Sequence, residues 1–589
     1  MPSPEPNPPT EPAAGPGAVP PAGPAPSAAV PAREVRFTLD GTEVAVDDDG
    51  ITLLDALRGR LGITSAKDGC SPQGQCGCCT VVVDGTARVA CVTPLRRVAG
   101  REVVTFDGLD ADVRGRWAEA FLGHGASQCG FCSPGIIVRL EALRAKVAAE
   151  GGDLRPGAVD RALAAHLCRC TGWQSIEEAA ADVLGVAPAD TPVALPGASD
   201  RDLEAAASRD LEAAARRATL ELGAPQRVGP DVAAGAVGFS ADTAPTGALV
   251  AVPGPDGGWA VAAGVTEARR AAGKVQGRRT TIEPAPPLDV PDGGWDLTLR
   301  TSWVDAAYVE TDASWCEPGG EPSPAAANGG AFGGKRRSPL PEAARALADE
   351  HGRAVLALWS REDCTRSAPK RPPLAAGIRA DGTGTVHVVR TEGIAARIAA
   401  VAPGLDVVEV DAAGPPTSTA LRAAGWAEAV VLLAGVGAPS EVVAVQPGAL
   451  GADDDRGERV VVRTPDGAVA EASVTIADGP SPVTRIAVRI AAGEVLDAVV
   501  LRSYCIGAAH MALSWVTSEG LAVDDDGTVL DLTVRSLGVL RAADMPPVDV
   551  EVRAGDGPPV RGSDAVFAAV AAATWRALGT PPVWPARPA

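Results

Sequence analysis

Nine of the twelve cysteines lie between Cys70 and Cys170, and this clustering is the strongest chemical signal in the sequence. Disulfide scaffolds are typical of small secreted domains, and neither the length of 589 residues nor any export signal fits that class. Cysteines at short spacings in such a chain instead predict metal binding. We expect the remaining three, Cys316, Cys364 and Cys505, to be small core residues.

The first set of thiols consists of Cys70, Cys76, Cys79 and Cys91. A plant-type [2Fe–2S] cluster is typically held by a Cys-x4-Cys-x2-Cys run and a fourth, more distant cysteine. Five residues separate Cys70 from Cys76, one more than usual, and Gly74 in this stretch can accommodate a bulge. Cys78 lies between the x2 pair, and we expect it to face away from the cluster.

The second set consists of Cys129, Cys132, Cys168 and Cys170. The first pair, in QCGFCSPG, opens a predicted helix, and the second, in CRCTGW, ends another, so that amides at a helix N-terminus can stabilise a negative cluster. Zinc sites also use Cys-x2-Cys pairs, but Cys-x-Cys is uncommon in them, and they seldom place three ligands on one loop before a β-hairpin. The two sets therefore favour two [2Fe–2S] clusters over zinc.

Strands and a short helix must position the first set. Residues 34–39 and 43–46 are expected to pair as a hairpin, and residues 52–61 have helical spacing with Thr52 as a cap. After the cysteine loop, residues 80–83 and 88–92 form a second predicted hairpin around Asp84-Gly85. This order predicts a β-grasp ferredoxin-like domain.

Helices must position the second set. Between residues 109 and 184 apolar side chains recur at helical spacing, with one helix expected to run up to Cys168. A linker rich in Pro and Ala follows, and then one charged helix over residues 202–222. The rest mixes alternating Val/Ala runs, Gly/Pro turns and helices, which indicates an α+β region.

The fold class expected is therefore multidomain α+β. Its predicted parts are a disordered Pro/Ala-rich tail (1–32), the ferredoxin-like domain (33–107), an α-helical [2Fe–2S]-binding bundle (108–185), a linker and helix (186–225), and the α+β region (226–589).

Residues 34 to about 185 resemble the iron–sulfur unit of the molybdenum hydroxylases, the family of xanthine dehydrogenase, aldehyde oxidase and CO dehydrogenase. The matching runs are LRGRLGITSAKDGC, CGCCTVVVDG, ASQCGFCSPGIIV and CRCTGW. The resemblance implies that the cluster of the helical domain lies nearest a molybdopterin, with Gln128 and Cys170 matching positions that contact it. It also implies that the other cluster passes electrons outward, often to a flavin.

The C-terminal region resembles the molybdopterin-binding part of the same family less evenly. NGGAFGGKRRSPLPEAARALADEHGRAVLALWSRED resembles the GGxFGGK loop, its helix and a following strand. Glycine-rich loops let backbone amides approach a ligand closely, although an ordinary turn before a helix has the same composition. The resemblance implies that five consecutive residues lie against the molybdenum cofactor: Gly330, Ala331, Phe332, Gly333 and Gly334.

This region also departs from the family. Family enzymes use a Gly-Glu motif as the base that takes a proton from Mo–OH, and the corresponding stretch here, PPVRGSDAVFAAVAAATW, offers Ser563 and Asp564. Asp564 is the candidate base, one methylene shorter than glutamate. The family's Gln-Gly pterin loop has no clear counterpart, and fewer than 400 residues remain for its two large lobes. We interpret residues 226–589 as a shortened, divergent molybdopterin-binding-like region.

Charge and composition exclude other classes. A formal net charge of −21 repels phosphate backbones, so no nucleic-acid partner is expected. No apolar run is long enough to span a bilayer, and we expect a cytoplasmic protein without a membrane partner.

Two functions remain. The chain is expected to be an oxidoreductase component that relays electrons from a molybdopterin site through two [2Fe–2S] clusters to an acceptor, with a flavoprotein or molybdopterin subunit as partner. The alternative is a complete, compact molybdenum hydroxylase that oxidises a small-molecule substrate, a heterocycle or an aldehyde. In that case molybdenum–molybdopterin is a further cofactor.

Overall fold

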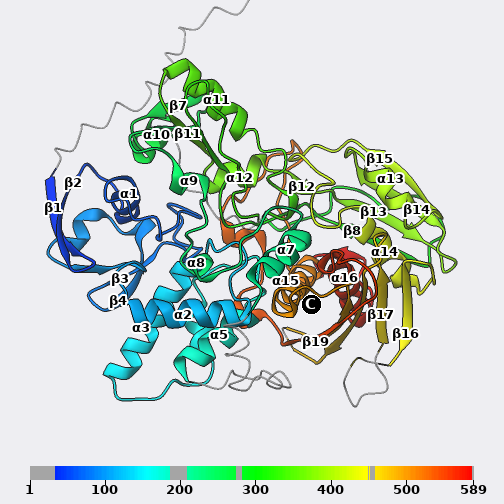
Figure 1. Cartoon of the computed structure of the whole chain (residues 1–589). Coiled ribbons are helices and arrows are strands. Elements are labelled where there is room, and N and C mark those ends of the chain that lie inside the picture. The colour runs from blue at the N-terminus through cyan, green and yellow to red at the C-terminus, as the bar shows by residue number, and fades with distance from the viewer. Residues whose placement is uncertain are drawn as a thin grey trace, which may run out of the picture.

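The computed structural model describes residues 33–185, 209–273, 282–329, 331–448, 450, 458–479 and 481–586 (Figure 1). The predicted tail at 1–32, Gly330 and residues 202–208 of the predicted helix at 202–222 lie outside the described residues. In Figure 1 the N-terminal sheet lies at the left, helices α2, α3 and α5 lie below it, the C-terminal sheet that includes residues 249–262 lies at the top, and the other two larger C-terminal sheets lie at the right.

A five-stranded sheet contains the elements that hold the first thiol set. Its order is β2 (Thr42–Asp48), β1 (Arg33–Leu39), β5 (Glu102–Val104), β3 (Thr80–Val83) and β4 (Thr86–Val89). Only β1 and β5 pair in parallel. Helix α1 (Leu53–Gly59) packs on it through buried leucines and begins with a capping box between Thr52 and Asp55.

The predicted strand at 88–92 is wrong at its C-terminal end. Strand β4 ends at Val89, and Ala90–Val92 form a single 3₁₀ turn. The amide of Ala90 donates to the carbonyl of Cys79 at 3.1 Å, and Thr93 then bonds back to Ala90, so the chain leaves the ladder. This turn carries Cys91 inward.

Four helices follow: α2 (Ala111–His124), α3 (Ser133–Ala149), α4 (Ala158–Leu163) and α5 (Gln174–Leu184). Trp117, Phe121 and Ile137 are fully buried between them. The helix predicted to reach Cys168 ends at Leu163 instead. The loop that follows includes Gly172 at φ 65°, a left-handed conformation in which a side chain would collide with the carbonyl of Ile506.

His124 at the end of α2 makes stability depend on pH. Burial opposes its charged form, but contacts with Glu178 and Asp182 outweigh that cost and raise the pKa of His124. A raised folded-state pKa adds stability that is complete below the unfolded pKa of about 6.5 and is lost as pH rises through the folded value. We expect His124→Gln to lower the free energy of unfolding most at about pH 6 and progressively less toward about pH 9.

The matched control for this prediction is His351→Gln, because His351 is an exposed histidine at the end of another helix. Denaturant unfolding at several pH values checks it. A loss of unfolding free energy by His124→Gln that grows as pH rises would contradict this prediction.

The C-terminal region begins with helix α7 (Leu211–Leu222), whose first turn is capped by the Asp210 carboxylate. Its three larger sheets follow in chain order. The first is β10 (Ala313–Cys316), β11 (Val355–Leu358), β6 (Leu249–Pro253) and β7 (Trp259–Ala262). The second is β15 (Leu405–Val410), β14 (Gly384–Val389), β13 (Leu374–Ile378), β8 (Leu297–Thr301) and β21 (Val583–Trp584). The third is β16 (Val443–Pro447), β17 (Glu458–Arg463), β18 (Val469–Ile476), β19 (Val483–Ala491) and β20 (Val548–Arg553).

The remaining described elements connect and cover these sheets. The strand pair is β9 (Val304–Asp305) with β12 (Lys370–Arg371). The helices are α8 (Pro230–Ala233), α9 (Ser240–Thr243), α10 (Val265–Ala271), α11 (Leu340–His351), α12 (Arg361–Ser367), α13 (Ile394–Ala399), α14 (Trp426–Val436), α15 (Ala498–Thr517) and α16 (Ser563–Ala577).

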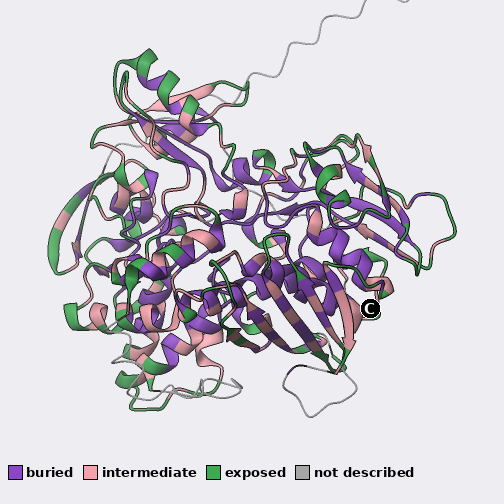
Figure 2. Ribbon diagram, turned by 45° about the vertical axis from the view of Figure 1, so that its right-hand side comes forward, coloured by how far each residue is buried: buried purple, intermediate pink, exposed green. Residues whose placement is uncertain are grey.

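Helices α14, α15 and α16 lie at the centre of the C-terminal region, where Figure 2 shows mostly buried ribbon. Many of their buried residues are alanines, which let helices approach closely in a chain with 3% aromatic residues. Helix α15 is long and apolar enough to span a bilayer, but 89% of its apolar window is buried inside the protein. It is therefore a core helix of this fold.

Candidate metal centres

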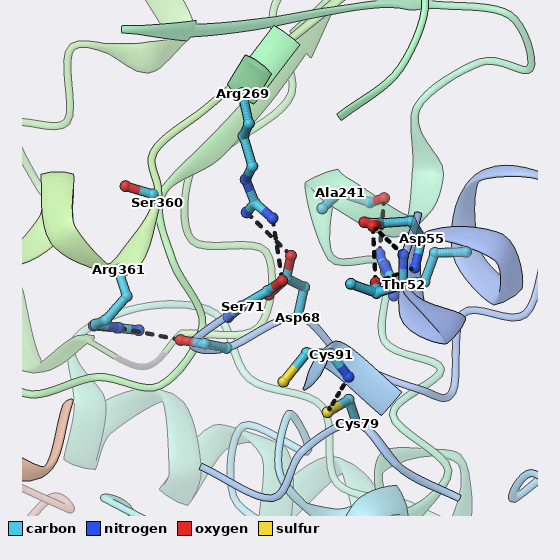
Figure 3. Close-up of polar contacts among 12 residues, drawn as sticks. Thr52, Asp55, Asp68, Ser71, Cys79, Cys91, Ala241, Arg269, Ser360 and Arg361 are labelled. Carbon is cyan, nitrogen blue, oxygen red and sulfur yellow. Dashed lines mark hydrogen bonds and ion pairs between the residues drawn. The ribbon is translucent and has the colours of Figure 1, made fainter. Parts of the chain in front are cut away.

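The first thiol group, defined as Cys70, Cys76, Cys79 and Cys91, is buried, with each residue at most 2% exposed. The amides of Gln75 and Cys76 donate to the Cys70 sulfur at 3.3 Å. The amide of Cys91 donates to the Cys79 sulfur at 3.4 Å, as Figure 3 shows. Hydrogen bonds from the thiols of Cys76 and Cys91 hold the pKa of Cys70 well below its usual range. The loop thus provides a buried sulfur that accepts several hydrogen bonds, which favour the thiolate form that binds metals.

The second thiol group, defined as Cys129, Cys132, Cys168 and Cys170, lies between the start of α3 and the loop before α5. Cys132 is the residue at which α3 begins. The sulfurs of Cys129 and Cys170 lie 3.6 Å apart, and a hydrogen bond from Cys132 lowers the pKa of Cys168 to about 6. A cavity of about 20 Å³ is lined by Cys129, Cys132 and Cys170, so the thiols surround space rather than packed side chains.

The arrangement of the sulfurs distinguishes a two-iron cluster from zinc. Among the described residues, no three His, Cys, Asp or Glu side chains surround one ion position. In the second thiol group the thiols meet in pairs, Cys129 with Cys170 and Cys132 with Cys168, whereas in the first group Cys91 contacts both Cys70 and Cys79. A tetrahedral zinc ion needs four ligands around one point, whereas a [2Fe–2S] cluster takes two ligands on each of two irons. The residues therefore fit the cluster.

One backbone hydrogen bond joins the two thiol groups. The amide of Leu167, the residue before Cys168, donates to the carbonyl of Cys76 at 2.9 Å. The contact is close because Gly135 and Gly77 lack side chains: a Cβ on Gly135 would lie 2.5 Å from the carbonyl of Gly77. The path from one ligand loop to the other is thus a few covalent bonds and one hydrogen bond.

The enlarged loop between Cys70 and Cys76 is anchored to the C-terminal region. Gly74 adopts φ 66°, the left-handed conformation that admits the extra residue. Gln73 donates to Glu362 at 2.9 Å and to the carbonyl of Leu532 at 3.0 Å, and accepts from the amide of Val534 at 2.9 Å. The extra length of the loop therefore brings a buried amide side chain into an interdomain contact.

Two arginines also hold this segment (Figure 3). Arg269 contacts Asp68 and Ser71, each at 3.2 Å. Arg361 donates to the carbonyl of Gly69 at 3.1 Å. The first ligand loop is thus held by the C-terminal region.

We expect Gln73→Ala to lower the free energy of unfolding by about 1–3 kcal/mol, because it leaves buried partners without their hydrogen bonds. The matched control is Gln75→Ala, since Gln75 accepts one hydrogen bond at 3.3 Å from Arg535 and is partly exposed. Denaturant unfolding of both variants checks the prediction. Equal effects at the two positions would contradict it.

Gln128 and the glycine-rich loop lie near the second thiol group. Gln128 is buried, its amide nitrogen donates to Ser503 at 3.0 Å, and its Oε1 has no partner in the described structure. Ala331 lines the thiol cavity, Phe332 lines the next one, and both have left-handed backbone conformations, with φ of 58° and 46°. A Cβ on Gly333 would lie 1.8 Å from the carbonyl of Ala420, and one on Gly334 would lie 2.9 Å from Tyr308.

The space beside Gln128 is nearly filled by the chain itself. Helix α15 approaches so closely that a Cβ on Gly507 would lie 1.9 Å from the carbonyl of Cys170. The cavities lined by Gln128 and by Phe332 have volumes of about 20 and 30 Å³, room for one or two waters. Pockets for ligands of pterin size hold about 300 Å³ or more. Neither of these two cavities, as it lies, accommodates a pterin.

Asp564 lies in the first turn of α16 and is held by two arginines. Its two oxygens contact Arg422 at 3.3 Å and Arg561 at 3.2 Å. Both carboxylate oxygens are engaged in this arrangement. The role of Asp564 as a base stays a prediction.

The sequence did not identify the charged residues around the second thiol group. Arg169, between the ligands Cys168 and Cys170, forms a buried bidentate pair with Glu519. Arg371 and Arg422 are also buried. The only local indication in the sequence is that Arg169 lies between Cys168 and Cys170 in the run CRC. Glu519 is 350 residues away in the chain, so no spacing pattern connects it to the cysteines.

Comparison with known proteins matches these features. Residues 105–181 match the [2Fe–2S] binding domain family. The chain is 39% identical over 146 residues to the iron-sulfur-binding subunit of xanthine dehydrogenase from Escherichia coli, covering 24% of this chain and 88% of that protein. It is 42% identical over 163 residues to xanthine dehydrogenase of Emericella nidulans, covering 25% of this chain but only 11% of that protein's length.

The structure as a whole is similar to aldehyde oxidoreductase from Desulfovibrio gigas. The TM-score is 0.63 at 15% identity, covering 94% of this chain and 99% of the other. This likeness shows a mixed α/β multidomain fold of the same kind.

Proposed function

This chain belongs to the molybdenum hydroxylase family, and on that premise we propose that it is the iron–sulfur electron-transfer component of such an oxidoreductase. Its eight paired cysteines would hold two [2Fe–2S] clusters, which supply one-electron transfer. Electrons would enter from a molybdopterin site, reach the second thiol group and then the first, and leave to an acceptor.

The observation that carries this proposal is the hydrogen bond of 2.9 Å between the Leu167 amide and the Cys76 carbonyl. It supports a direct connection between the two ligand loops. Buried surroundings on both sides exclude water from that connection, since Cys76 and Cys168 are each 1% exposed.

The domain assignment is part of the proposal. Residues 33–107 would be a β-grasp ferredoxin-like domain, 108–185 a helical [2Fe–2S]-binding bundle, 186–225 a linker and helix, and 226–589 a molybdopterin-binding-like region. The sheet order and the four helices α2 to α5 support the first two assignments.

Partners and location follow from the same premise. A relative named as a subunit favours partner subunits for this chain, a flavoprotein, a molybdopterin subunit or both. We propose a cytoplasmic location, where thiols stay reduced and available to bind iron.

A second candidate is a complete single-chain hydroxylase acting on a heterocycle or an aldehyde. The likeness to aldehyde oxidoreductase over 94% of this chain favours it. Gln128, Gly330, Ala331, Phe332, Gly333 and Gly334 would then face molybdopterin, and Asp564 would act as base. This arrangement requires α15 and the loop at 331–334 to separate enough to admit the pterin.

Metal analysis of the full-length chain tests both candidates. The proposal expects about four irons with acid-labile sulfide, two distinct electron paramagnetic resonance signals after reduction, and no stoichiometric molybdenum. Two irons or fewer would overturn it. Stoichiometric molybdenum with turnover of an aldehyde or purine would favour the second candidate, and Asp564→Ala should then abolish turnover without removing iron.

A further inference from the structure

His166 is a buried residue that belongs to the loop of the second thiol group and contacts the loop of the first. It stands two residues before Cys168 in the sequence and is 4% exposed. Its ring packs on Gly77, which lies between Cys76 and Cys79 of the first group: a Cβ on Gly77 would lie 2.4 Å from Cδ2 of the ring. The side chain therefore joins two loops that the sequence separates by about ninety residues.

The hydrogen bonds of Thr80 determine which ring nitrogen of His166 donates. The hydroxyl oxygen of Thr80 lies 2.6 Å from the carbonyl oxygen of Gly77 and 3.1 Å from Nε2 of His166. A carbonyl oxygen only accepts, so the single hydroxyl proton of Thr80 must point at Gly77. The hydroxyl oxygen is then the acceptor for His166, and Nε2 carries the proton that it donates. His166, Thr80 and Gly77 thus form two hydrogen bonds that run in one direction.

Both ends of this hydrogen-bonded chain are held by regular structure. The amide of His166 donates to the carbonyl of Leu163, the last residue of α4, at 2.7 Å. Thr80 is the first residue of β3, and its own amide donates to the same Gly77 carbonyl at 3.1 Å. Gly77 has φ 73°, a left-handed conformation that disfavours any side chain where the ring now packs.

The contact of His166 lies next to the backbone hydrogen bond between the two loops. The Leu167 amide donates to the Cys76 carbonyl at 2.9 Å, and His166 reaches Gly77 through Thr80. Two successive residues of one loop are therefore connected to two successive residues of the other. A single hydrogen bond would let the loops rotate about it, whereas a second connection beside the first removes that freedom.

We propose that His166 is a positioning residue, whose hydrogen bond from Nε2 to Thr80 fixes the separation and orientation of the two ligand loops. This inference rests on the proposed function, in which each loop would hold one [2Fe–2S] cluster. Magnetic and electronic coupling between two such centres falls steeply as they move apart, so the two connections keep the coupling at one value. A histidine that only fills space would affect stability and leave the coupling unchanged.

Electron paramagnetic resonance of the fully reduced, full-length protein measures this coupling, because two nearby paramagnetic centres split each other's signals. His166→Leu fills the space but removes the donor, so it should decrease and broaden the splitting while the iron content stays at about four atoms per chain. His166→Gln should retain the splitting, because the side-chain amide nitrogen of glutamine can donate in place of Nε2. Absence of splitting in the wild type, or unchanged splitting in His166→Leu, would overturn the proposal.

The matched control is His510→Leu. His510 of α15 is also buried, and its Nε2 donates to the carbonyl of Leu540 at 3.0 Å, a residue of neither ligand loop. This variant should lower the free energy of unfolding and leave the splitting as it is in the wild type. Equal losses of splitting in His166→Leu and His510→Leu would also overturn the proposal.

If His166→Leu does not fold, Thr80→Val tests the same hydrogen bond, since it keeps the shape of the side chain and removes the acceptor. It should decrease the splitting, whereas Thr80→Ser should not. Exchange of the Leu167 amide, followed by mass spectrometry, needs no cluster signal and should become about fivefold faster in Thr80→Val.

The two proposals fail in different ways. Two irons or a single resonance signal in the wild type would refute the electron relay. Four irons, with wild-type splitting and wild-type exchange of the Leu167 amide in Thr80→Val, would refute only the positioning role of His166.

Discussion

Replacing Cys168 by alanine should reduce the iron content from about four to about two atoms per chain. Cys168 has the lowered pKa of the second thiol group, about 6, and its sulfur accepts from Cys132. Without it, one iron loses a ligand at a buried position. One electron paramagnetic resonance signal should disappear while the signal of the first thiol group remains.

The matched control for this prediction is Cys78→Ala. Cys78 is fully buried in the loop between two ligands, and its thiol contacts the carbonyl of Cys76 at 3.7 Å. Removing a small buried thiol that holds no iron should leave iron content unchanged. Loss of iron from Cys78→Ala, or full iron in Cys168→Ala, would show that the ligand assignment is wrong.

Replacing Glu519 by glutamine should lower the free energy of unfolding by about 3–5 kcal/mol, because it leaves Arg169 charged and buried without its carboxylate. The two side chains are 3% and 1% exposed and are joined by two hydrogen bonds. The remaining acceptor for Arg169 is the carbonyl of Ala306 at 3.0 Å. Denaturant unfolding of the iron-loaded protein measures the change.

Glu551→Gln provides the comparison. Glu551 is 52% exposed and pairs with Arg489 at 2.8 Å on the surface of β19 and β20. Exposed pairs contribute about 0–1 kcal/mol. Similar losses of unfolding free energy for the two variants would mean that the buried pair contributes no more to stability than the exposed pair.

The cysteine sets and their supporting elements could be predicted because they are encoded locally. Cys76 and Cys79 are three residues apart, and the hairpin and helix signals lie within a few residues of them. Element ends were less predictable: β4 stops at Val89 because the chain then folds into the 3₁₀ turn that the Thr93 amide closes on the carbonyl of Ala90, which strand propensity does not show.

The contacts that bury the site could not be predicted, because they join distant parts of the chain. Gln73 and Glu362 are 289 residues apart, and Gln128 and Ser503 are 375 apart. Arg371 and Glu428 form their pair through tertiary packing alone. Motif resemblance predicts Phe332 near a cofactor, and this contact stays a prediction; the ring lies 4.8 Å from the guanidinium of Arg422 beside a cavity of about 30 Å³.

The contacts that fix the first ligand loop to the C-terminal region determine how the proposed relay can transfer electrons to its acceptor. Arg269, Arg361 and Gln73 tie this loop to the C-terminal region. A domain fastened in this way cannot swing out to deliver electrons, as a tethered carrier would. The rate of electron transfer within the protein should therefore be insensitive to solvent viscosity. Only the diffusion of the acceptor to the protein should slow as the viscosity rises.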